Sequence, residues 1–149
     1  MIEYRKAASH DIKHLVQYRK QQLIDEGEVF DTEIDDELAD YFMSSLSNNS
    51  LIAWLAIDGN KIVATSGICF YKLPPTSRNP SGKNAYITNM YTLPEYRRQG
   101  IGTRLLELVI NEAKLLKYSI IRLHASADGK SIYSKAGFSD TDGFMALRL

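Results

Sequence analysis

A short glycine-containing segment between an extended run and an amphipathic helix places the strongest constraint on how this chain can fold. Residues 91–103 read Tyr-Thr-Leu-Pro-Glu-Tyr-Arg-Arg-Gln-Gly-Ile-Gly-Thr. Gly100 and Gly102 lack a Cβ, so the backbone there can adopt positive φ and approach a ligand closely. The segment predicts a strand, a loop and a helix N-terminus whose free N–H groups, with Arg97 and Arg98 beside them, favour a phosphate. The apolar face of that helix consists of Ile101, Leu105, Leu108, Val109, Ala113 and Leu116.

Other glycine-rich phosphate motifs do not match this segment. A P-loop needs Gly-Lys-Ser/Thr at the start of the helix, whereas this chain has Gly-Ile-Gly-Thr. A dinucleotide fingerprint needs a glycine at position 105 and an acidic residue at the end of the next strand. This chain has Leu105 and no acidic residue at that strand end. A tight turn that caps a helix and binds no ligand is the remaining alternative.

Two motifs in a fixed order resemble the signatures of the GNAT superfamily of N-acetyltransferases. The first is Arg97-x-x-Gly100-x-Gly102, which resembles the pyrophosphate loop R/Q-x-x-G-x-G/A of that family. The second is Tyr133-x-x-x-Gly137-Phe138, which resembles its short helix with a tyrosine, closed by Gly-Phe. The resemblance is densest over residues 84–139, and elsewhere it rests on the order of the elements.

The sequence patterns and the resemblance together predict an α/β (α+β) fold in a single N-acetyltransferase domain, residues 1–149. A GNAT-like mixed, mostly antiparallel sheet of six to seven strands is expected, flanked by helices in the order β-α-α-β-β-β-α-β-α-β. Asp58-Gly59-Asn60 is a strong hairpin signal between two of the strands. The expected strands are residues 2–6, 51–57, 61–71, 84–92, 120–125 and 143–149. Four helices are expected. The first follows Ser9, the second covers about 32–46, the third runs from the glycine loop to about 117, and the fourth covers about 129–136.

Composition narrows the class of protein. Hydrophobic residues make up 44% of the chain and charged residues 24%, values typical of a folded protein. Cys69 is the only cysteine, so no intramolecular disulfide can form and a reducing, cytoplasmic setting is expected. No apolar stretch reaches 18 residues, so no membrane span is expected. The zero net charge gives no support for a nucleic-acid partner, and the three scattered histidines predict no metal site.

The resemblance implies acetyl-CoA as the cosubstrate and a primary amine of a small molecule or peptide as the acceptor. It implies that the backbones of Met90, Tyr91 and Thr92 pair with the pantetheine arm. The family often has an asparagine where this chain has Ser126, which makes Ser126 a further expected contact with the arm. The pyrophosphate is expected on Arg97, Arg98, Gln99, Gly100, Ile101, Gly102 and Thr103.

Tyr133 is the expected general acid, because a phenol of pKa near 10 can donate to a departing thiolate. The alternative is a tyrosine that packs on the sheet with its hydroxyl in water. Glu26 and Glu28 are the best acidic candidates for the acceptor site, with Glu28 as the base, unless both are solvated loop charges. Asn89 is expected to contact the acceptor, and His124 could face the same gap. No cysteine–histidine–acid arrangement suggests an acyl-enzyme, so direct transfer is expected.

Charge is distributed unevenly along the chain. From Asp25 to Asp40 there are nine acidic residues and no Lys or Arg. In the family this region forms one wall of the acceptor site, so a cationic acceptor is expected. The alternative is that the acids coat a solvated helix face.

Two other functions remain open from the sequence. One is a non-catalytic acyl-CoA-binding or sensing module on the same fold, and the other is an interaction protein whose acidic region docks a basic partner. The sequence does not identify the acceptor, and it leaves a monomer and a homodimer both open.

Overall fold

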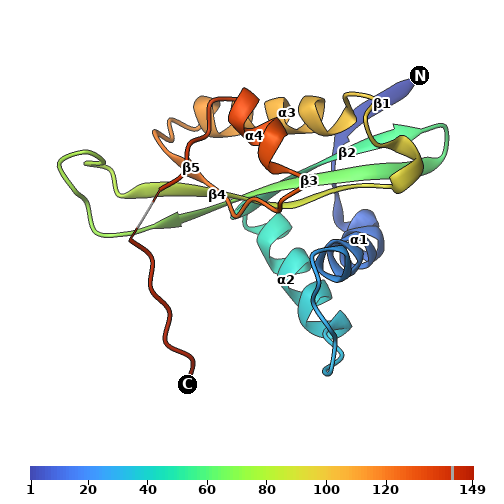
Figure 1. Ribbon diagram of the computed structural model, residues 1–149, viewed down its shortest axis with the longest axis horizontal. Helices are drawn as coiled ribbons and strands as arrows, with labels where there is room; N and C mark the ends of the chain where they lie inside the picture. Colours follow the sequence, from blue (N-terminus) through green and yellow to red (C-terminus); the bar gives the residue numbers. More distant parts are fainter. Residues whose placement is uncertain (142) are drawn as a thin grey trace.

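Five strands lie across the sheet in the same order as in the chain (Figure 1). The computed structural model describes residues 1–141 and 143–149. The first three pairs of neighbouring strands are antiparallel, and the last pair, β4 and β5, is parallel. The strands are β1 (Ile2–Lys6), β2 (Leu51–Asp58), β3 (Lys61–Lys72), β4 (Lys83–Thr92) and β5 (Ile121–Arg122).

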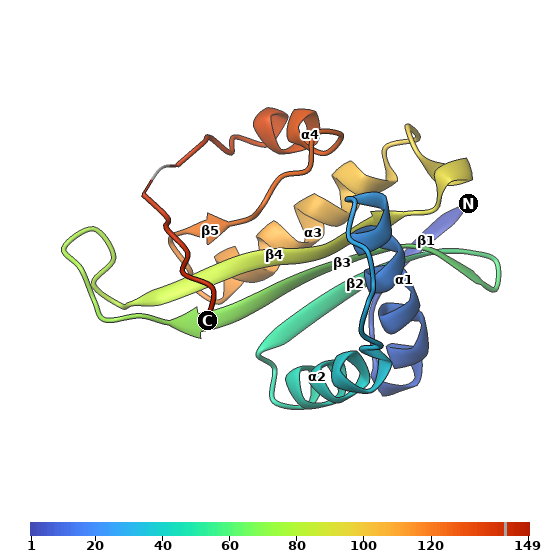
Figure 2. The same cartoon turned by 60° about the horizontal axis from the view of Figure 1, so that its bottom comes forward.

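Helices cover both faces of the sheet. The helices α1 (Ile12–Asp25) and α2 (Asp35–Ser47) lie on one face, while α3 (Ile101–Leu115) and α4 (Lys130–Lys135) lie on the other (Figures 1 and 2). No helix among the described residues is long and apolar enough to cross a membrane.

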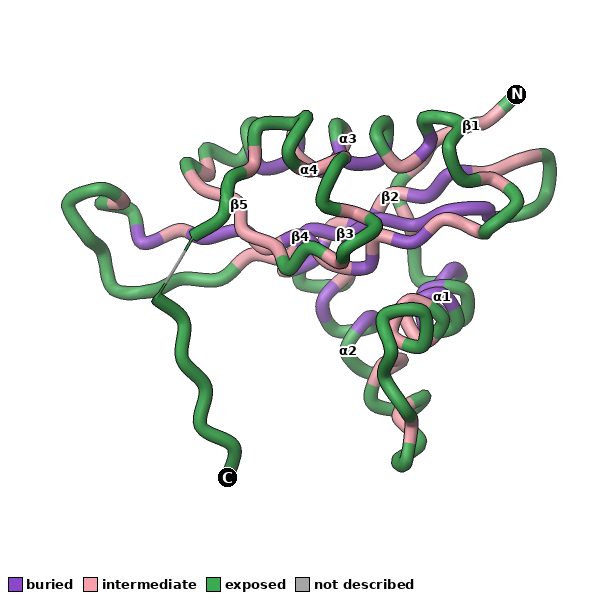
Figure 3. Tube along the Cα trace, in the orientation of Figure 1, coloured by how far each residue is buried: buried purple, intermediate pink, exposed green. Residues whose placement is uncertain are grey.

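The core has one part on each side of the central strands, which are therefore buried on both faces (Figure 3). Leu15 of α1, Phe42 of α2 and Leu51 of β2 meet under the first pair of helices. Leu106 and Val109 of α3 pack with apolar side chains of β3 and β4 on the opposite face. The predicted apolar face of α3 is largely confirmed, since Ile101, Leu105, Val109 and Ala113 are all buried.

The sheet has fewer strands than the predicted six to seven. The segment 143–149, predicted as a strand, is extended but pairs with no strand among the described residues. A strand needs a neighbour for its backbone N–H and C=O groups, and the segment instead runs away from the sheet. The strand predicted at 120–125 is shortened to β5 because the chain parts from β4 after Arg122. The predicted order of elements holds from β1 to α4, and the hairpin between β2 and β3 is confirmed.

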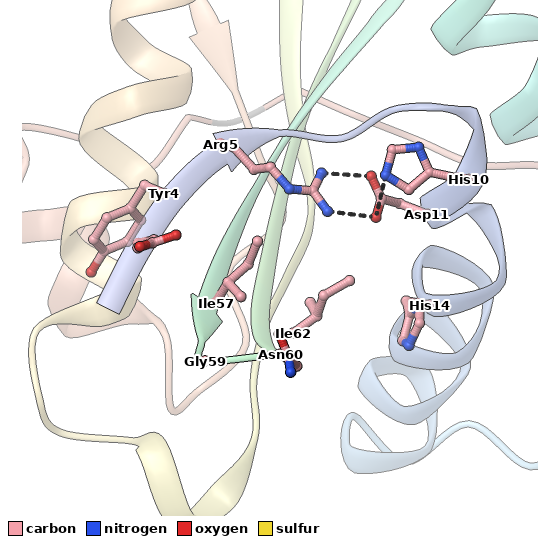
Figure 4. Close-up of a pocket in the computed structure, with 10 residues that line it drawn as sticks. Tyr4, Arg5, His10, Asp11, His14, Ile57, Gly59, Asn60 and Ile62 are labelled. Carbon is pink, nitrogen blue, oxygen red and sulfur yellow. Dashed lines mark hydrogen bonds and ion pairs between the residues drawn. The ribbon is translucent and has the colours of Figure 1, made fainter. Parts of the chain in front are cut away.

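An ion pair between a buried Asp11 and a partly exposed Arg5 fixes the start of α1 against β1. Arg5 donates from both terminal nitrogens to the Asp11 carboxylate, at 2.8 and 2.9 Å, and the Ala8 N–H donates to the same group at 2.8 Å (Figure 4). Asp11 is only 2% exposed, and the Arg5 guanidinium lowers its pKa against the opposing effect of burial. A cavity of about 460 Å³ lies beside this pair, lined also by His10 and His14. Because the carboxylate already has its partners, we assign this pair a structural role.

The Asp11 ion pair yields a stability prediction. Asp11→Asn is expected to lower the free energy of unfolding by about 1.5–3 kcal/mol at neutral pH, the usual size of hydrogen bonds to a charged group. The folded pKa lies below the unfolded value, so the stabilisation is present above about pH 4 and is lost as the pH falls further. Urea denaturation at neutral and acidic pH measures both effects.

Glu95→Gln is the matched control for this test. Glu95 pairs with Lys61 on the surface at 3.0 Å, and both side chains are more than half exposed. No measurable loss of stability is expected for this variant. Equal stabilities of the Asp11 and Glu95 variants would contradict the role assigned to the Asp11 pair.

Candidate active site

The strands β4 and β5 pair over two residues only and then part. Ala85 pairs with Ile121 and Tyr86 with Arg122. Beyond this point β4 continues to Thr92 paired with β3 alone. The edge of β4 from about Thr88 onward is therefore not paired with β5. Unpaired N–H and C=O groups of this kind can bind an extended ligand that contains amides.

A bulge bends β4 at the place where it leaves β5. Asn89 and Met90 lie opposite a single residue of β3, Ser66, and Asn89 has a φ of 56°. The hydroxyl of Thr65 donates to the Asn89 carbonyl at 2.8 Å and holds the bulge from the β3 side. A bulge of this type bends its strand and re-aims the side chains on it.

The Asn89 side chain is buried and incompletely bonded. It is 3% exposed, and its Nδ2 has no hydrogen-bond partner among the described residues. A Cβ built on Gly67 would lie 3.6 Å from the Asn89 Cβ and 3.4 Å from Leu51, so Asn89 is on the sheet face that α1 and α2 cover. An unpaired buried amide costs free energy, and such a group is typical of sites that bind a ligand.

The loop between β4 and α3 has the backbone geometry expected of an anion site. Arg98 and Gly100 both adopt left-handed φ, at 59° and 83°. Gly100 is the N-cap of α3 and no side chain caps this end, so the first N–H groups of the helix lack an internal partner. A Cβ on Gly102 would lie 3.7 Å from Ile132 of α4 and 4.0 Å from Thr92 of β4. The helix thus begins where β4 and α4 come together.

The two arginines of the loop have different environments. The Arg97 Nε donates to the Thr92 carbonyl at 2.9 Å, and its Nη2 pairs with Asp25 at the end of α1 at 3.1 Å. Its guanidinium also lies over the Tyr91 ring, 5.6 Å from the centroid. Arg98 is exposed and makes no side-chain hydrogen bond or ion pair with any other described residue. Arg97 therefore holds the loop, and Arg98 is the cation available to an anion.

Tyr133 is held in α4 between a glycine and an aromatic ring. A Cβ on Gly129 would lie only 3.0 Å from the Tyr133 ring, and the Phe138 ring packs edge-on with a centroid distance of 6.0 Å. Burial, with smaller contributions from the charges of Glu26 and Tyr86, raises the pKa of Tyr133 to about 12. The phenol is therefore protonated throughout the physiological pH range.

Ser126 caps the turn that leads into α4. Its Oγ accepts a hydrogen bond from the Gly129 N–H at 3.1 Å. This bond uses an acceptor position of the oxygen and leaves the hydroxyl hydrogen available to a ligand. A cofactor contact at Ser126 stays a prediction.

The two candidate acids differ in their relation to Tyr133. Glu26 is exposed and accepts from Gln22 at 3.2 Å, and its charge acts on the phenols of both Tyr133 and Tyr86. Glu28 is exposed, and its side chain makes no hydrogen bond or ion pair with another residue among 1–141 and 143–149. Of the two, Glu26 is the one whose charge contributes to the raised pKa of Tyr133.

The sequence analysis did not consider Tyr86, which lies on β4 where that strand pairs with β5. Burial raises the pKa of Tyr86, while the His124 N–H and the Arg19 guanidinium act in the opposite direction. The His124 ring packs edge-on against Tyr86, with centroids 5.9 Å apart. The signal that could have identified Tyr86 is strand alternation, since alternate residues of β4 share one face.

The acidic stretch is partly neutralised. Asp25 pairs with Arg97, and Lys20 pairs with both Glu33 at 2.8 Å and Asp35 at 2.5 Å. The remaining acids have no ion pair with a basic side chain in the described part of the chain. They are Glu26, Glu28, Asp31, Asp36, Glu37 and Asp40.

A cavity of about 500 Å³ lies between α3 and α4. Thr103 and Leu106 line it from α3, and Ile132 and Lys135 from α4. No group of three metal-ligating side chains occurs among the residues that the structure describes.

Comparison with known families agrees with this geometry. Residues 14–138 match the family model described as the acetyltransferase (GNAT) family. The chain belongs to this family. Among curated proteins, none matches the chain.

Solved structures of GNAT acetyltransferases have the same fold. A predicted acetyltransferase from Clostridium acetobutylicum, crystallised with acetyl-CoA, is 47% identical, with 99% of this chain and 96% of that one covered and a TM-score of 0.96. A GCN5-related N-acetyltransferase from Ralstonia eutropha JMP134 is 24% identical over 99% of both chains, with a TM-score of 0.92. Glucosamine-6-phosphate N-acetyltransferase from Arabidopsis thaliana is 20% identical over 99% of this chain and 98% of that one, with a TM-score of 0.77. The last two likenesses concern the fold alone.

Proposed function

We propose that this protein transfers the acetyl group of acetyl-CoA directly to a primary amine of a small molecule or peptide. The observation that carries the proposal is the uncapped start of α3 at Gly100, beside the unpaired edge of β4 and the phenol of Tyr133. The relative from Clostridium acetobutylicum, whose crystals contain acetyl-CoA, supports the same cosubstrate.

The residues of the loop fit a diphosphate and a pantetheine arm. The N–H groups of Ile101, Gly102 and Thr103 and the free Arg98 side chain would bind the negative charge, as helix N-termini do. Gln99 and Arg97 would shape the loop, since their side chains bond to the backbone at Glu95 and Thr92. The backbones of Met90, Tyr91 and Thr92, with Ser126 across the gap, would bond to the arm's amides.

Tyr133 would act on the leaving group. Acetyl-CoA supplies a thioester, in which the carbonyl carbon can accept an amine while the carbon–sulfur bond breaks. A phenol that stays protonated up to high pH can donate a hydrogen bond to the sulfur as negative charge develops there. Its raised pKa makes Tyr133 a stable donor rather than a strong acid.

Glu26 is the preferred group for taking the proton of the amine. Its carboxylate is exposed, and its charge contributes to the raised pKa of Tyr133, which favours it over Glu28. A carboxylate can take a proton directly or through one water molecule. Glu28 remains the alternative base on the same turn, and the unpaired Asn89 amide would orient the acceptor.

The acceptor is proposed to be cationic. Six acids of residues 25–40 lack a basic partner in the described structure, and this excess of negative charge would attract ammonium groups. The three ion-paired acids reduce the field relative to the sequence count. Polyamines and lysine-like side chains are therefore proposed ahead of anionic amines.

The phosphate loop gives the first functional prediction. Gly102→Val is expected to weaken acetyl-CoA binding at least tenfold, because the branched side chain would block backbone approach to the diphosphate. Gly102→Ala tests the same site more mildly, since its Cβ meets only ordinary contacts within the protein. Titration calorimetry measures the affinity, with Leu115→Ala, an exposed position at the far end of α3, as the control variant. Unchanged affinity in folded Gly102 variants would remove the loop from the cofactor site.

The role of Tyr133 gives the second functional prediction. Tyr133→Phe keeps the ring and removes the donor, so kcat is expected to fall roughly 100-fold with acetyl-CoA affinity nearly unchanged. Because the pKa of Tyr133 is about 12, its ionisation is expected to cause no loss of wild-type kcat below about pH 10. Tyr118→Phe, outside the site, is the matched control. Wild-type turnover in Tyr133→Phe would limit Tyr133 to packing, and cofactor binding without any turnover by the wild type would favour a non-catalytic acyl-CoA module.

The acceptor class gives the third functional prediction. A polyamine is expected to show a higher kcat/KM than an acidic amino acid, with a value that falls as salt screens the field. The double variant Asp36→Asn/Asp40→Asn, which removes two negative charges, should reduce this salt dependence. A preference for the anionic amine would contradict the assignment.

A further inference from the structure

Arg19 is a cation on the sheet-facing side of α1, and no acidic side chain pairs with it in the described part of the chain. It lies four residues after Leu15, so the two share one face of the helix, and Leu15 is fully buried with Phe42 and Leu51. Arg19 itself is half-buried. A partly buried charge without a counter-charge is unfavourable, and such a group is typical of a site that binds a ligand of the opposite charge.

A chain of hydrogen bonds connects Arg19 to the proposed base. The Arg19 Nη1 donates to the Gln22 Oε1 at 3.1 Å, and the Gln22 Nε2 donates to the Glu26 Oε1 at 3.2 Å. Arg19 therefore belongs to the same row of side chains on α1 as Glu26. A guanidinium has five N–H donors, and the only side-chain acceptor among the described residues is this neutral amide oxygen. Most of the donors of Arg19 are left for a ligand.

The charge of Arg19 acts on two phenols that belong to other elements. Burial raises the pKa of Tyr41 on α2 and that of Tyr86 on β4, and the positive charge of Arg19 opposes this effect at both. The helices α1 and α2 lie together on this face of the sheet (Figure 2). Both phenols stay neutral at physiological pH, so they do not balance the charge of Arg19.

Asn89 has a second unused donor on the same face of the sheet. Its side chain is 3% exposed, and its Nδ2 has no acceptor among the described residues. The bond from Thr65 to the Asn89 carbonyl fixes the strand at this point, three residues after Tyr86. Arg19 and Asn89 thus have donors to spare, and a ligand with oxygen acceptors would satisfy both.

We propose that the acceptor is a cationic amino acid of the lysine type and that Arg19 and Asn89 bind its carboxylate. This inference rests on the proposed function and names its acceptor class. A carboxylate has two oxygens in one plane, which match the guanidinium and can also accept from an amide. The unpaired Glu26 and Glu28 would attract the ammonium groups of the same molecule. A polyamine lacks the carboxylate, and an acidic amino acid adds a second negative charge that these glutamates repel.

Two amines that differ only by a carboxylate test the acceptor class. Cadaverine is lysine without its carboxylate, and thiol release from acetyl-CoA measures kcat/KM for each. The value for L-lysine is expected to be higher by about tenfold or more, the usual size of a hydrogen bond between charged groups. An equal or higher value for cadaverine would overturn the carboxylate site and leave the acetyltransferase proposal standing. Acetyl-CoA binding without turnover of any amine would overturn both.

Substitution of Arg19 tests the residue itself. Arg19→Met keeps an apolar stem and removes the donors, so kcat/KM for lysine is expected to fall about tenfold, mainly through KM, with no loss for cadaverine. Retained turnover of cadaverine also shows that the variant is folded. Arg19→Lys keeps the charge without the planar fork and should recover part of the loss. Lys13→Met, at an exposed position of α1, is the matched control and should change neither value. Equal losses with both amines in Arg19→Met would limit Arg19 to a structural role and overturn the proposal.

Discussion

The parting of β4 and β5 after two residue pairs is the constraint on which the site depends. A parallel pair that continued would satisfy the backbone of β4 and leave no place for a ligand. The Asn89 bulge bends β4 at this point, and the bond from Thr65 holds it from the neighbouring strand. The start of α3 lies close to the end of β4 and to α4, the helix that carries Tyr133. The fold thus creates unsatisfied hydrogen-bonding groups where an extended amide-containing molecule can use them.

Much of the fold could be predicted because local patterns and tertiary packing agree. The glycine loop, the apolar face of α3 and the hairpin at Gly59 are each encoded within a few residues, and all three are present in the structure. The end of the sheet could not be predicted in the same way. Segment 143–149 has the pattern of a strand, but its pairing depends on a neighbour that no local pattern specifies.

The site was predictable to the extent that its residues belong to motifs. Gly100, Gly102 and Tyr133 stand in two such motifs, and Gly102 lies beside Ile132 of α4, the helix that carries Tyr133. Tyr86 stands in no motif, and its contact with the His124 ring depends on the packing of the folded chain. The two glutamates illustrate the same limit. Glu26 and Glu28 are indistinguishable in sequence, and only in the folded protein does the charge of Glu26 contribute to the raised pKa of Tyr133.

The ion pair between Arg97 and Asp25 joins the loop that precedes α3 to the end of α1. In the proposed reaction these two segments would contact different molecules, the cofactor and the acceptor. A shift of either segment would be carried by this pair or would break it, so occupancy of one would change affinity at the other, and the effect would be reciprocal. Both side chains are about 40% exposed, at 44% and 39%, so water and salt weaken the link. A contribution of at most about 1 kcal/mol limits this cooperativity to roughly fivefold.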